Sequence, residues 1–376
     1  MDGKQIDVAV VATAVTAPAA RTSASRSLVA DLALRFGALA VGVALMARFP
    51  ALRLPVGMLL VAAVAYANGA NDVSKSIATL VGSGVSEYRK AVLWATGWTV
   101  AGALLSTLTG AALVKTFSTG LLASESAVTL SLATAAIVGT TGWVLLASRV
   151  GLPVSTTHAL TGSIVCAAAV AIGVSQVKWA VLAQKVALPL LLSPFLGLVL
   201  AVLFILLVSR LRDSRALGPV HWLASGAVAG ARGLNDAPKL VGLGILLLLM
   251  SFQARPDRFQ GYGLALLIAV AMGVGSYLGG LRVTETLAKK VTKMDDREGT
   301  AANVVAGVLV SGAALLGLPV STTHVVSGSI IGIGVERRDG RLDLRVVRDM
   351  VLAWVVTLPG AGAIAVLAWV LASRLV

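Results

Sequence analysis

Long apolar stretches alternate with short polar segments along almost the whole chain. A polar break at 210–215 divides them into an earlier and a later series. The stretches cover residues 28–47, 56–81, 91–114, 128–148, 151–174 and 179–208, and then 221–250, 261–283, 301–316, 317–335 and 346–371. Because a helix needs about 20 apolar residues to cross a bilayer, the pattern predicts an all-α polytopic membrane protein. A membrane β-barrel would instead show short strands of alternating polarity.

The later series repeats the earlier one, and the same two polar motifs occur in each. Gly-Ala-Asn-Asp-Val-Ser-Lys at 69–75 corresponds to Gly-Leu-Asn-Asp-Ala-Pro-Lys at 233–239. Pro-Val-Ser-Thr-Thr-His stands at 153–158 and again at 319–324. The second Asn-Asp pair follows the first by 164 residues, and the second Ser-Thr-Thr-His block follows by 166. Such a duplication predicts a membrane protein of two homologous repeats with one site between them.

The pattern divides the chain into four parts. We expect a flexible Ala/Ser-rich extension at 1–27 and one extra transmembrane helix at 28–47, followed by the repeats at 56–209 and 220–374. A signal peptide is the less favoured alternative for the extension, because acidic residues occur where a signal would be positively charged.

A Gly-Leu-Pro sequence precedes each Ser-Thr-Thr-His block, at 151–153 and 317–319. Proline lacks a backbone donor and clashes with the preceding helical turn, so a helix is expected to stop here. Each block then opens a further run of small and apolar side chains. The interpretation is a re-entrant hairpin or a span broken at the proline, either of which must be buried in protein or line a cavity. Basic residues occur in loops throughout the chain, so the positive-inside rule does not decide whether the two repeats are parallel or inverted.

The composition agrees with a membrane protein. Hydrophobic residues make up 57% of the 376 residues, charged residues only 13%, and the mean hydropathy is +0.90. The net charge of +14 comes mostly from short loops, where anionic lipid headgroups attract basic residues, so we expect no nucleic acid as a partner. A single cysteine, Cys166, excludes an intrachain disulfide and a cysteine-rich metal site.

Acidic residues lie deep inside the apolar segments at Asp72 and Asp236, and each follows an asparagine. A carboxylate at membrane depth is costly and usually marks an ion path. The carboxylate and amide oxygens suit Na⁺, and the carboxylate can alternatively carry a proton. Lys75 and Lys239 follow the acids by three residues, so each lysine is expected either to pair with its acid or to face an anion.

The Ser-Thr-Thr blocks predict an anion site. Hydroxyls at the start of a helix lie beside free backbone N–H groups, and the helix dipole favours negative charge there. The alternative is ordinary helix capping, which explains one hydroxyl in each block. The following histidines are expected either to pack with a hydrogen bond or to act as proton relay or anion contact, and no Cys/His cluster suggests zinc. The residues concerned are Ser155, Thr156, Thr157, His158, Ser321, Thr322, Thr323 and His324.

Other functional classes fit the motifs less well. An anion channel would lack paired acids in its path, and an enzyme would show a nucleophile with an orienting base or a metal cluster. We therefore expect that the protein is not an enzyme.

Taken together, these motifs resemble the inorganic phosphate transporter (PiT) family. The residues 69–73 with Val-Gly-Ser-Gly at 81–84 are similar to its first-repeat signature. Pro-x-Ser-Thr-Thr-His resembles its hairpin signature, and Gly-Gly-Leu-Arg-Val-Thr-Glu-Thr at 279–286 with Lys290 resembles a further conserved segment. The resemblance covers the chain from about Val56 onward.

The resemblance implies a multi-pass secondary transporter of the cell membrane, built from inverted repeats and assembled as a homodimer. It implies phosphate import by symport with Na⁺ or H⁺ and no cofactor. Sulfate, which is also a tetrahedral oxyanion but lacks the proton that phosphate offers to an acid such as Asp72 or Asp236, stays open as the alternative substrate. Carried over by position, Asn71, Asp72, Asn235 and Asp236 would bind the coupling cation, and the two acids would also help to hold phosphate. The six Ser and Thr residues would cradle the phosphate at the hairpin tips. The chain departs from the family pattern at Lys75, where many members have Asn, at Pro238 within the second motif, and at 91–107, which lacks an acid.

Overall fold

The computed structural model describes residues 18–123, 128–208, 217–252, 257–337 and 339–375. Nearly all of these residues are helical. The earlier helices are α2 (Pro18–Arg48), α3 (Arg53–Gly82), α4 (Tyr88–Thr109), α5 (Ala111–Lys115), α6 (Leu130–Val150), α7 (Thr156–Ala171), α8 (Trp179–Val181) and α9 (Leu188–Val208). The later helices are α10 (Leu217–Phe252), α11 (Arg258–Gly279), α12 (Leu281–Glu285), α13 (Asp296–Leu315), α14 (Thr322–Arg337) and α15 (Leu344–Leu375). Nine helices in this part of the chain are long and apolar enough to cross a membrane, which confirms the polytopic all-α protein.

Two predicted boundaries need correction. The extra helix α2 begins at Pro18, so the last ten residues of the expected flexible extension are helical, while residues 1–17 lie outside the described residues. The apolar stretch at 91–114 is not one helix, because α4 ends at Thr109 and α5 continues into a π-helical turn over Thr116–Gly120. A matching π turn, Thr286–Lys290, follows α12, and a third, Leu182–Ala187, joins α8 to α9.

The chain stops its helices at both Gly-Leu-Pro sequences, as predicted. Helix α6 ends at Val150 and α7 begins only at Thr156; α13 and α14 are separated in the same way. Gly151 has a φ of 77° and Gly317 a φ of 67°. This left-handed backbone favours glycine because it lacks a Cβ, and it turns the chain away from the preceding helix. By contrast, Pro238 does not interrupt its motif, because α10 continues through it.

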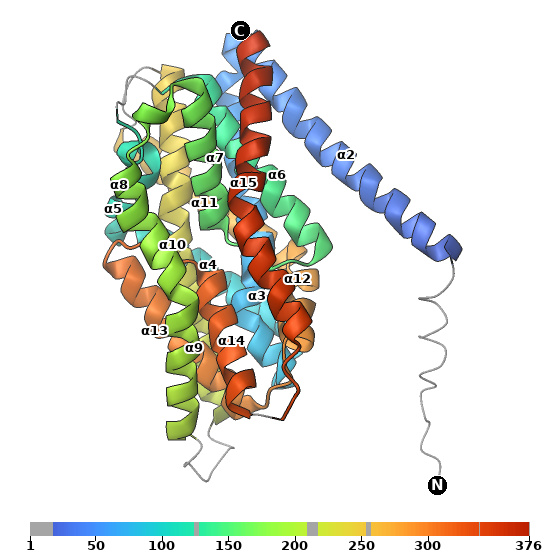
Figure 1. Ribbon diagram of the computed structural model, residues 1–376. Helices are drawn as coiled ribbons and strands as arrows, with labels where there is room; N and C mark the ends of the chain where they lie inside the picture. The colour runs from blue at the N-terminus through green and yellow to red at the C-terminus, as the bar shows by residue number, and fades with distance from the viewer. Residues whose placement is uncertain (1–17, 124–127, 209–216, 253–256, 338, 376) are drawn as a thin grey trace.

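The helices of each half pack mainly on helices of the opposite half. Helix α3 packs on α11, whereas its counterpart α10 packs on α4. Helix α7 packs on α15, and its counterpart α14 packs on α9. In Figure 1 α7 lies in the upper part of the molecule and α14 in the lower part, while α2 runs diagonally away from the bundle. The starts of α7 and α14 therefore come close to the middle of α3 and α10, where the Asn-Asp motifs lie.

Glycines permit the closest of these crossings. A Cβ on Gly69 of α3 would overlap the carbonyl oxygen of Met272, and one on Gly275 of α11 would overlap that of Tyr66. The crossing of α4 and α10 is equally tight, because a Cβ on Gly102 would overlap the carbonyl oxygen of Gly230. Small residues at membrane helix crossings let backbones approach closely. These contacts fix the helices that carry the Asn-Asp motifs.

Candidate functional site

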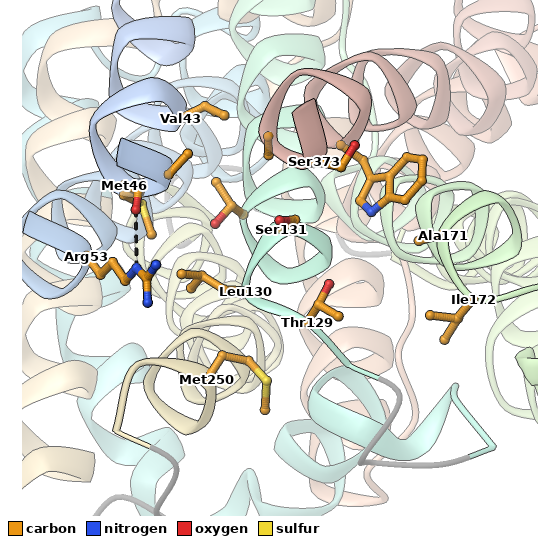
Figure 2. A pocket seen from close by; sticks show the side chains of 14 residues that line it. Val43, Met46, Arg53, Thr129, Leu130, Ser131, Ala171, Ile172, Met250 and Ser373 are labelled. Atoms are coloured by element: carbon orange, nitrogen blue, oxygen red, sulfur yellow. Dashed lines mark hydrogen bonds between the residues drawn. The ribbon is translucent and has the colours of Figure 1, made fainter. Parts of the chain in front are cut away.

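One hollow of about 450 Å³ lies between α2, α6 and the end of α15 (Figure 2). Most of its lining is apolar, including Val43, Leu130 and Met250, and Arg53 donates from Nε to the carbonyl oxygen of Met46 at 3.3 Å. The hollow contains none of the residues of the two repeated motifs. The candidate site therefore lies elsewhere, among buried polar groups.

The Asn-Asp motifs lie in the interior of the bundle. Asn71 and Lys75 of α3 are completely buried, and Asp72 is 2% exposed. On α10, Asn235 is completely buried and Asp236 is 4% exposed. Buried charges are stable only when other groups pair with them and satisfy their hydrogen bonds. The partners of each charge therefore define the site.

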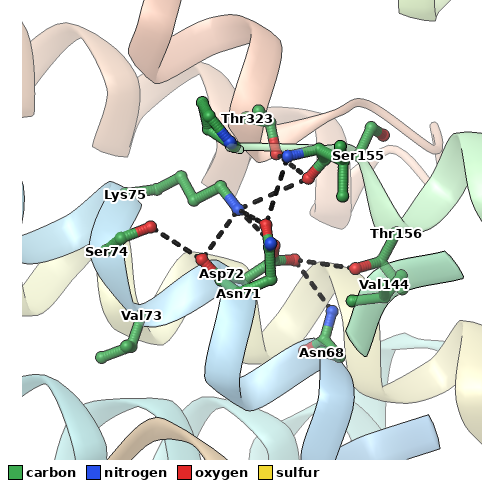
Figure 3. A network of polar contacts seen from close by, with 12 residues as sticks. Asn68, Asn71, Asp72, Val73, Ser74, Lys75, Val144, Ser155, Thr156 and Thr323 are labelled. Atoms are coloured by element: carbon green, nitrogen blue, oxygen red, sulfur yellow. Dashed lines mark hydrogen bonds and ion pairs between the residues drawn. The ribbon is translucent and has the colours of Figure 1, made fainter. Parts of the chain in front are cut away.

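The ammonium group of Lys75 is surrounded by oxygen atoms (Figure 3). Its Nζ lies 2.5 Å from Asp72 Oδ1, 2.5 Å from Asn71 Oδ1 and 2.9 Å from the Asn71 carbonyl oxygen. The carbonyl oxygen of Val154, in the loop before α7, is 3.4 Å away. Asn71 is itself held in place, because its Nδ2 donates to Ser148 Oγ at 2.9 Å and to the Leu152 carbonyl oxygen at 3.1 Å.

Lys239 has an equivalent environment in the second half. Its Nζ donates to Asp236 Oδ1 at 2.9 Å, to Asn235 Oδ1, and to the carbonyl oxygen of Val320 at 3.3 Å. It also reaches the first half, where it donates to Thr157 Oγ1 at 2.8 Å. The sequence left each lysine two possible contacts, its neighbouring acid or an anion. In the structure both lysines form the ion pair with the neighbouring acid.

Asn68 joins the two acids. Its Nδ2 donates to Asp72 Oδ2 at 2.9 Å and to Asp236 Oδ2 at 3.2 Å. Thr156 at the start of α7 donates from Oγ1 to the same Asp72 oxygen at 3.2 Å (Figure 3). The two carboxylates, which are 164 residues apart in the sequence, therefore belong to one network. The sequence analysis missed Asn68, because nothing distinguishes it from other asparagines before the helices are packed.

The serines of the two blocks cap their helices. Ser155 Oγ accepts from the backbone N–H of His158, and Ser321 Oγ accepts from that of His324, both at 3.2 Å. Each hydroxyl keeps its own hydrogen free to donate. Thr323 donates to the carbonyl oxygen of Val154 at 2.8 Å, so the loop before α7 touches the start of α14.

The two histidines lie against each other. The ring centroids of His158 and His324 are 4.7 Å apart, and His324 also packs 4.2 Å from the ring of Trp354. His324 Nδ1 is 3.0 Å from the Leu190 carbonyl oxygen. Within the described chain, His158 Nδ1, His324 Nε2 and the hydroxyl of Thr322 are buried without a hydrogen-bond partner. These three groups remain available to a bound molecule.

Arg232 is a further charge that the sequence analysis missed. It precedes Asp236 by one helical turn on α10 and occupies the position that corresponds to Asn68 on α3. Its side chain is completely buried, with Nη2 donating to Thr99 Oγ1 at 2.6 Å and to Ser276 Oγ at 3.0 Å. Nε and Nη1 have no partner among the described residues. An arginine inside an apolar segment is itself a functional signal, and it could have been recognised from the sequence.

The charges of the site favour an anion. Two carboxylates are matched by two ammonium groups, and the guanidinium of Arg232 adds one further positive charge. Around them lie the hydroxyls and N-terminal ends of two helices, which also favour negative charge. No group of three His, Cys, Asp or Glu side chains that would suit a metal occurs in the part of the chain that the structure describes.

Helices long and apolar enough to cross a membrane surround a network of buried charges built by both halves of the chain, which defines the class as a multi-pass membrane protein with an internal polar site. The chain belongs to the phosphate transporter family, whose model matches it twice, over residues 68–219 and 212–365. The two matches follow the duplication seen in the motifs.

Individual relatives support this assignment. A protein of Rhizobium meliloti (strain 1021) is 31% identical over 81% of this chain and 92% of its own length. One of Mycobacterium tuberculosis (strain ATCC 25618 / H37Rv) is 33% identical over 80% of this chain and 72% of its own. Both are named "Probable low-affinity inorganic phosphate transporter". A solved structure titled "The sodium-dependent phosphate transporter" has the same fold, with a TM-score of 0.76 and 23% identity over 86% of this chain and the whole of the other.

Proposed function

We propose that the protein imports inorganic phosphate across the cell membrane by secondary active transport, in symport with a cation, either Na⁺ or H⁺. The observation that carries the proposal is the single buried network in which Asn68 joins Asp72 to Asp236 and Lys239 reaches Thr157. Family membership and the names of the relatives point to the same substrate. We propose transport without covalent chemistry, so the protein is no enzyme.

In this proposal phosphate binds between the starts of α7 and α14. The unpartnered hydroxyl of Thr322 and the hydroxyl hydrogens of Ser155 and Ser321 donate to its oxygens, together with backbone N–H groups at the helix starts. The guanidinium of Arg232 supplies the positive charge that offsets the anion. Neutral donors distributed around a tetrahedral ion suit both phosphate and sulfate.

The acids favour phosphate over sulfate. Asp72 and Asp236 present carboxylate oxygens that accept hydrogen bonds, and phosphate near neutral pH has a P–OH group that donates one. Sulfate has no such proton, so its oxygens would face carboxylate oxygens without a bond. Burial makes an unmade hydrogen bond costly, about 1–3 kcal/mol, which corresponds to roughly a 5- to 150-fold preference.

We further propose that the two repeats are inverted and that each contains a re-entrant hairpin, α6–α7 and α13–α14. The crosswise packing of the halves and the opposite placement of α7 and α14 in Figure 1 support this topology. Helices α7 and α14 have 16 residues each, which is about 24 Å of helix and less than the roughly 30 Å of a bilayer core. Movement of one group of helices against the other would expose the site to alternate sides.

The test is uptake of labelled phosphate by proteoliposomes that contain the purified protein. We expect accumulation when a cation gradient is imposed, with protein-free liposomes as the control. A 100-fold excess of unlabelled phosphate should abolish the signal, whereas halving it should take at least fivefold more sulfate than unlabelled phosphate. Equal inhibition by sulfate would reject the substrate preference, and equilibration without accumulation under both a Na⁺ and an H⁺ gradient would reject symport.

A further inference from the structure

Each buried lysine of the site has more oxygen neighbours than it has hydrogens to donate. An ammonium group carries three N–H donors. Lys75 Nζ nevertheless has four oxygens within 3.4 Å, and Lys239 Nζ has four, the farthest at 3.3 Å. All eight contacts are to oxygen. The surroundings are therefore closer to the coordination shell of a cation than to an ordinary hydrogen-bond set.

The types of oxygen are those that a hard cation prefers. Each shell combines a carboxylate oxygen, an asparagine side-chain oxygen and a backbone carbonyl oxygen from the loop before a short helix, Val154 in one half and Val320 in the other. The fourth ligand is the Asn71 carbonyl oxygen in the first shell and the Thr157 hydroxyl in the second. Carboxylate, carbonyl and hydroxyl oxygens are the usual ligands of hard cations in proteins.

The asparagines that the sequence analysis assigned to the coupling cation thus have their oxygens turned toward a lysine. Asn71 Oδ1 accepts from Lys75, and Asn235 Oδ1 accepts from Lys239. Both ammonium groups are inaccessible, since Lys75 is 0% and Lys239 is 2% exposed. A sodium ion could enter either shell only if the lysine left it, and that lysine would then need another buried partner.

We propose that Lys75 and Lys239 are built-in cations that fill two sodium-type sites, so that phosphate uptake by this protein does not require Na⁺. The inference rests on the proposed function and narrows it. In a carrier that takes its cations from solution, sodium must first offset the charge of the acids before an anion can bind. Here the lysines neutralise Asp72 and Asp236 permanently, and Arg232 leaves one positive charge for the anion. Of the two coupling ions of the proposed function, the proton remains.

The first experiment compares initial phosphate uptake by wild-type proteoliposomes in Na⁺ and in choline, under the same imposed pH difference. We expect rates that agree within twofold. A fall of fivefold or more in choline would overturn the inference while supporting phosphate transport. Absence of uptake in both media would instead contradict the proposed function, and the inference would then be decided by sodium binding alone.

Sodium binding is measured on the purified protein without any transport. Thermal unfolding in detergent is followed as Na⁺ replaces choline at constant ionic strength. The wild-type Tm should shift by less than about 1 °C, because a ligand that does not bind the folded state cannot stabilise it. A saturable rise of several degrees in the wild type would show that sodium enters the shells and would overturn the inference.

Removing a lysine should create the site that it fills. In Lys75→Asn and Lys239→Asn the shell oxygens lose their ammonium group, so Na⁺ should raise the Tm saturably and should speed any remaining uptake at least fivefold over choline. Lys178→Asn is the matched control, because Lys178 is exposed and far along the chain from both motifs; it should behave as wild type. If Lys75→Asn and Lys239→Asn both fold but Na⁺ changes neither their Tm nor their uptake, the shells are not cation sites. If neither variant folds, the two wild-type measurements decide the question.

Discussion

Replacing Arg232 by methionine tests whether a fixed positive charge attracts the substrate. Methionine is unbranched and apolar, and it carries no charge. The guanidinium it removes is completely buried, donates only to the hydroxyls of Thr99 and Ser276, and has two nitrogens without a partner in the described structure. Arg232 is therefore costly for folding, which suggests that its charge serves binding.

The expected magnitudes differ for binding and for stability. At an effective dielectric constant of about 20, two unit charges attract by about 4 kcal/mol at about 4 Å and by about 2 kcal/mol at twice that separation, and the lower value is taken for Arg232 and a bound anion. Loss of that attraction corresponds to roughly a 30-fold weaker affinity. The free energy of unfolding should change by no more than about 2 kcal/mol in either direction, because replacing a buried charge by an apolar side chain is often neutral or stabilising, so the variant should still fold.

The assay is the concentration dependence of phosphate uptake, with stability followed by thermal unfolding in detergent. We expect the KM of Arg232→Met to rise about 30-fold while the protein stays folded. Arg232→Lys, which keeps the charge, should stay within about fivefold of wild type. An unchanged KM in a folded Arg232→Met variant would refute the electrostatic argument, and an equal loss in both variants would show that the shape of the guanidinium matters more than its charge.

Three further predictions concern the site and its frame. Asp72→Asn leaves Lys75 without its ion pair and should reduce gradient-driven uptake at least tenfold; full uptake would contradict the role of the acid. Gly151→Ala should lower the free energy of unfolding by about 1–2 kcal/mol, because the φ of 77° disfavours a Cβ. The control for Gly151→Ala is Gly312→Ala, which adds its Cβ in open space on α13 and should not lower the free energy of unfolding. Equal losses of stability in the two variants would rule out backbone strain at Gly151. Gly275→Val should disrupt the α3–α11 crossing and lower the yield of folded protein, which size-exclusion chromatography would detect as aggregation; a monodisperse, active variant would contradict close packing there.

The sequence by itself determined the helices and the duplication. Apolar stretches long enough to span a bilayer have few alternatives to helix, because lipid cannot satisfy backbone polar groups. Gly-Leu-Pro at 151–153 and 317–319 stopped the helices where it should, since that effect is local. The hydropathy pattern failed at Gly110, where the predicted stretch divides into α4 and α5, because the pattern does not register the weak helix propensity of a single glycine. Helix α10, by contrast, continues through Pro238.

The sequence also located the two acids of the site and their lysines, since the cost of burying a charge makes each intramembrane acid conspicuous, although Arg232 was missed. It could not decide between the two contacts open to Lys75 and Lys239. That choice depends on where the loops before α7 and α14 place the carbonyl oxygens of Val154 and Val320, which are distant in the chain.

Only the tertiary structure brought the halves into one site. Asn68 contacts both acids and Lys239 contacts Thr157 because α3 and α10 pack on helices of the opposite half, through glycine contacts whose partners no local pattern specifies. The same packing gives Arg232 its place beside the acids. Helices form from interactions between residues three and four apart, whereas the site depends on contacts between residues 77 to 168 positions apart, and those are set by packing alone.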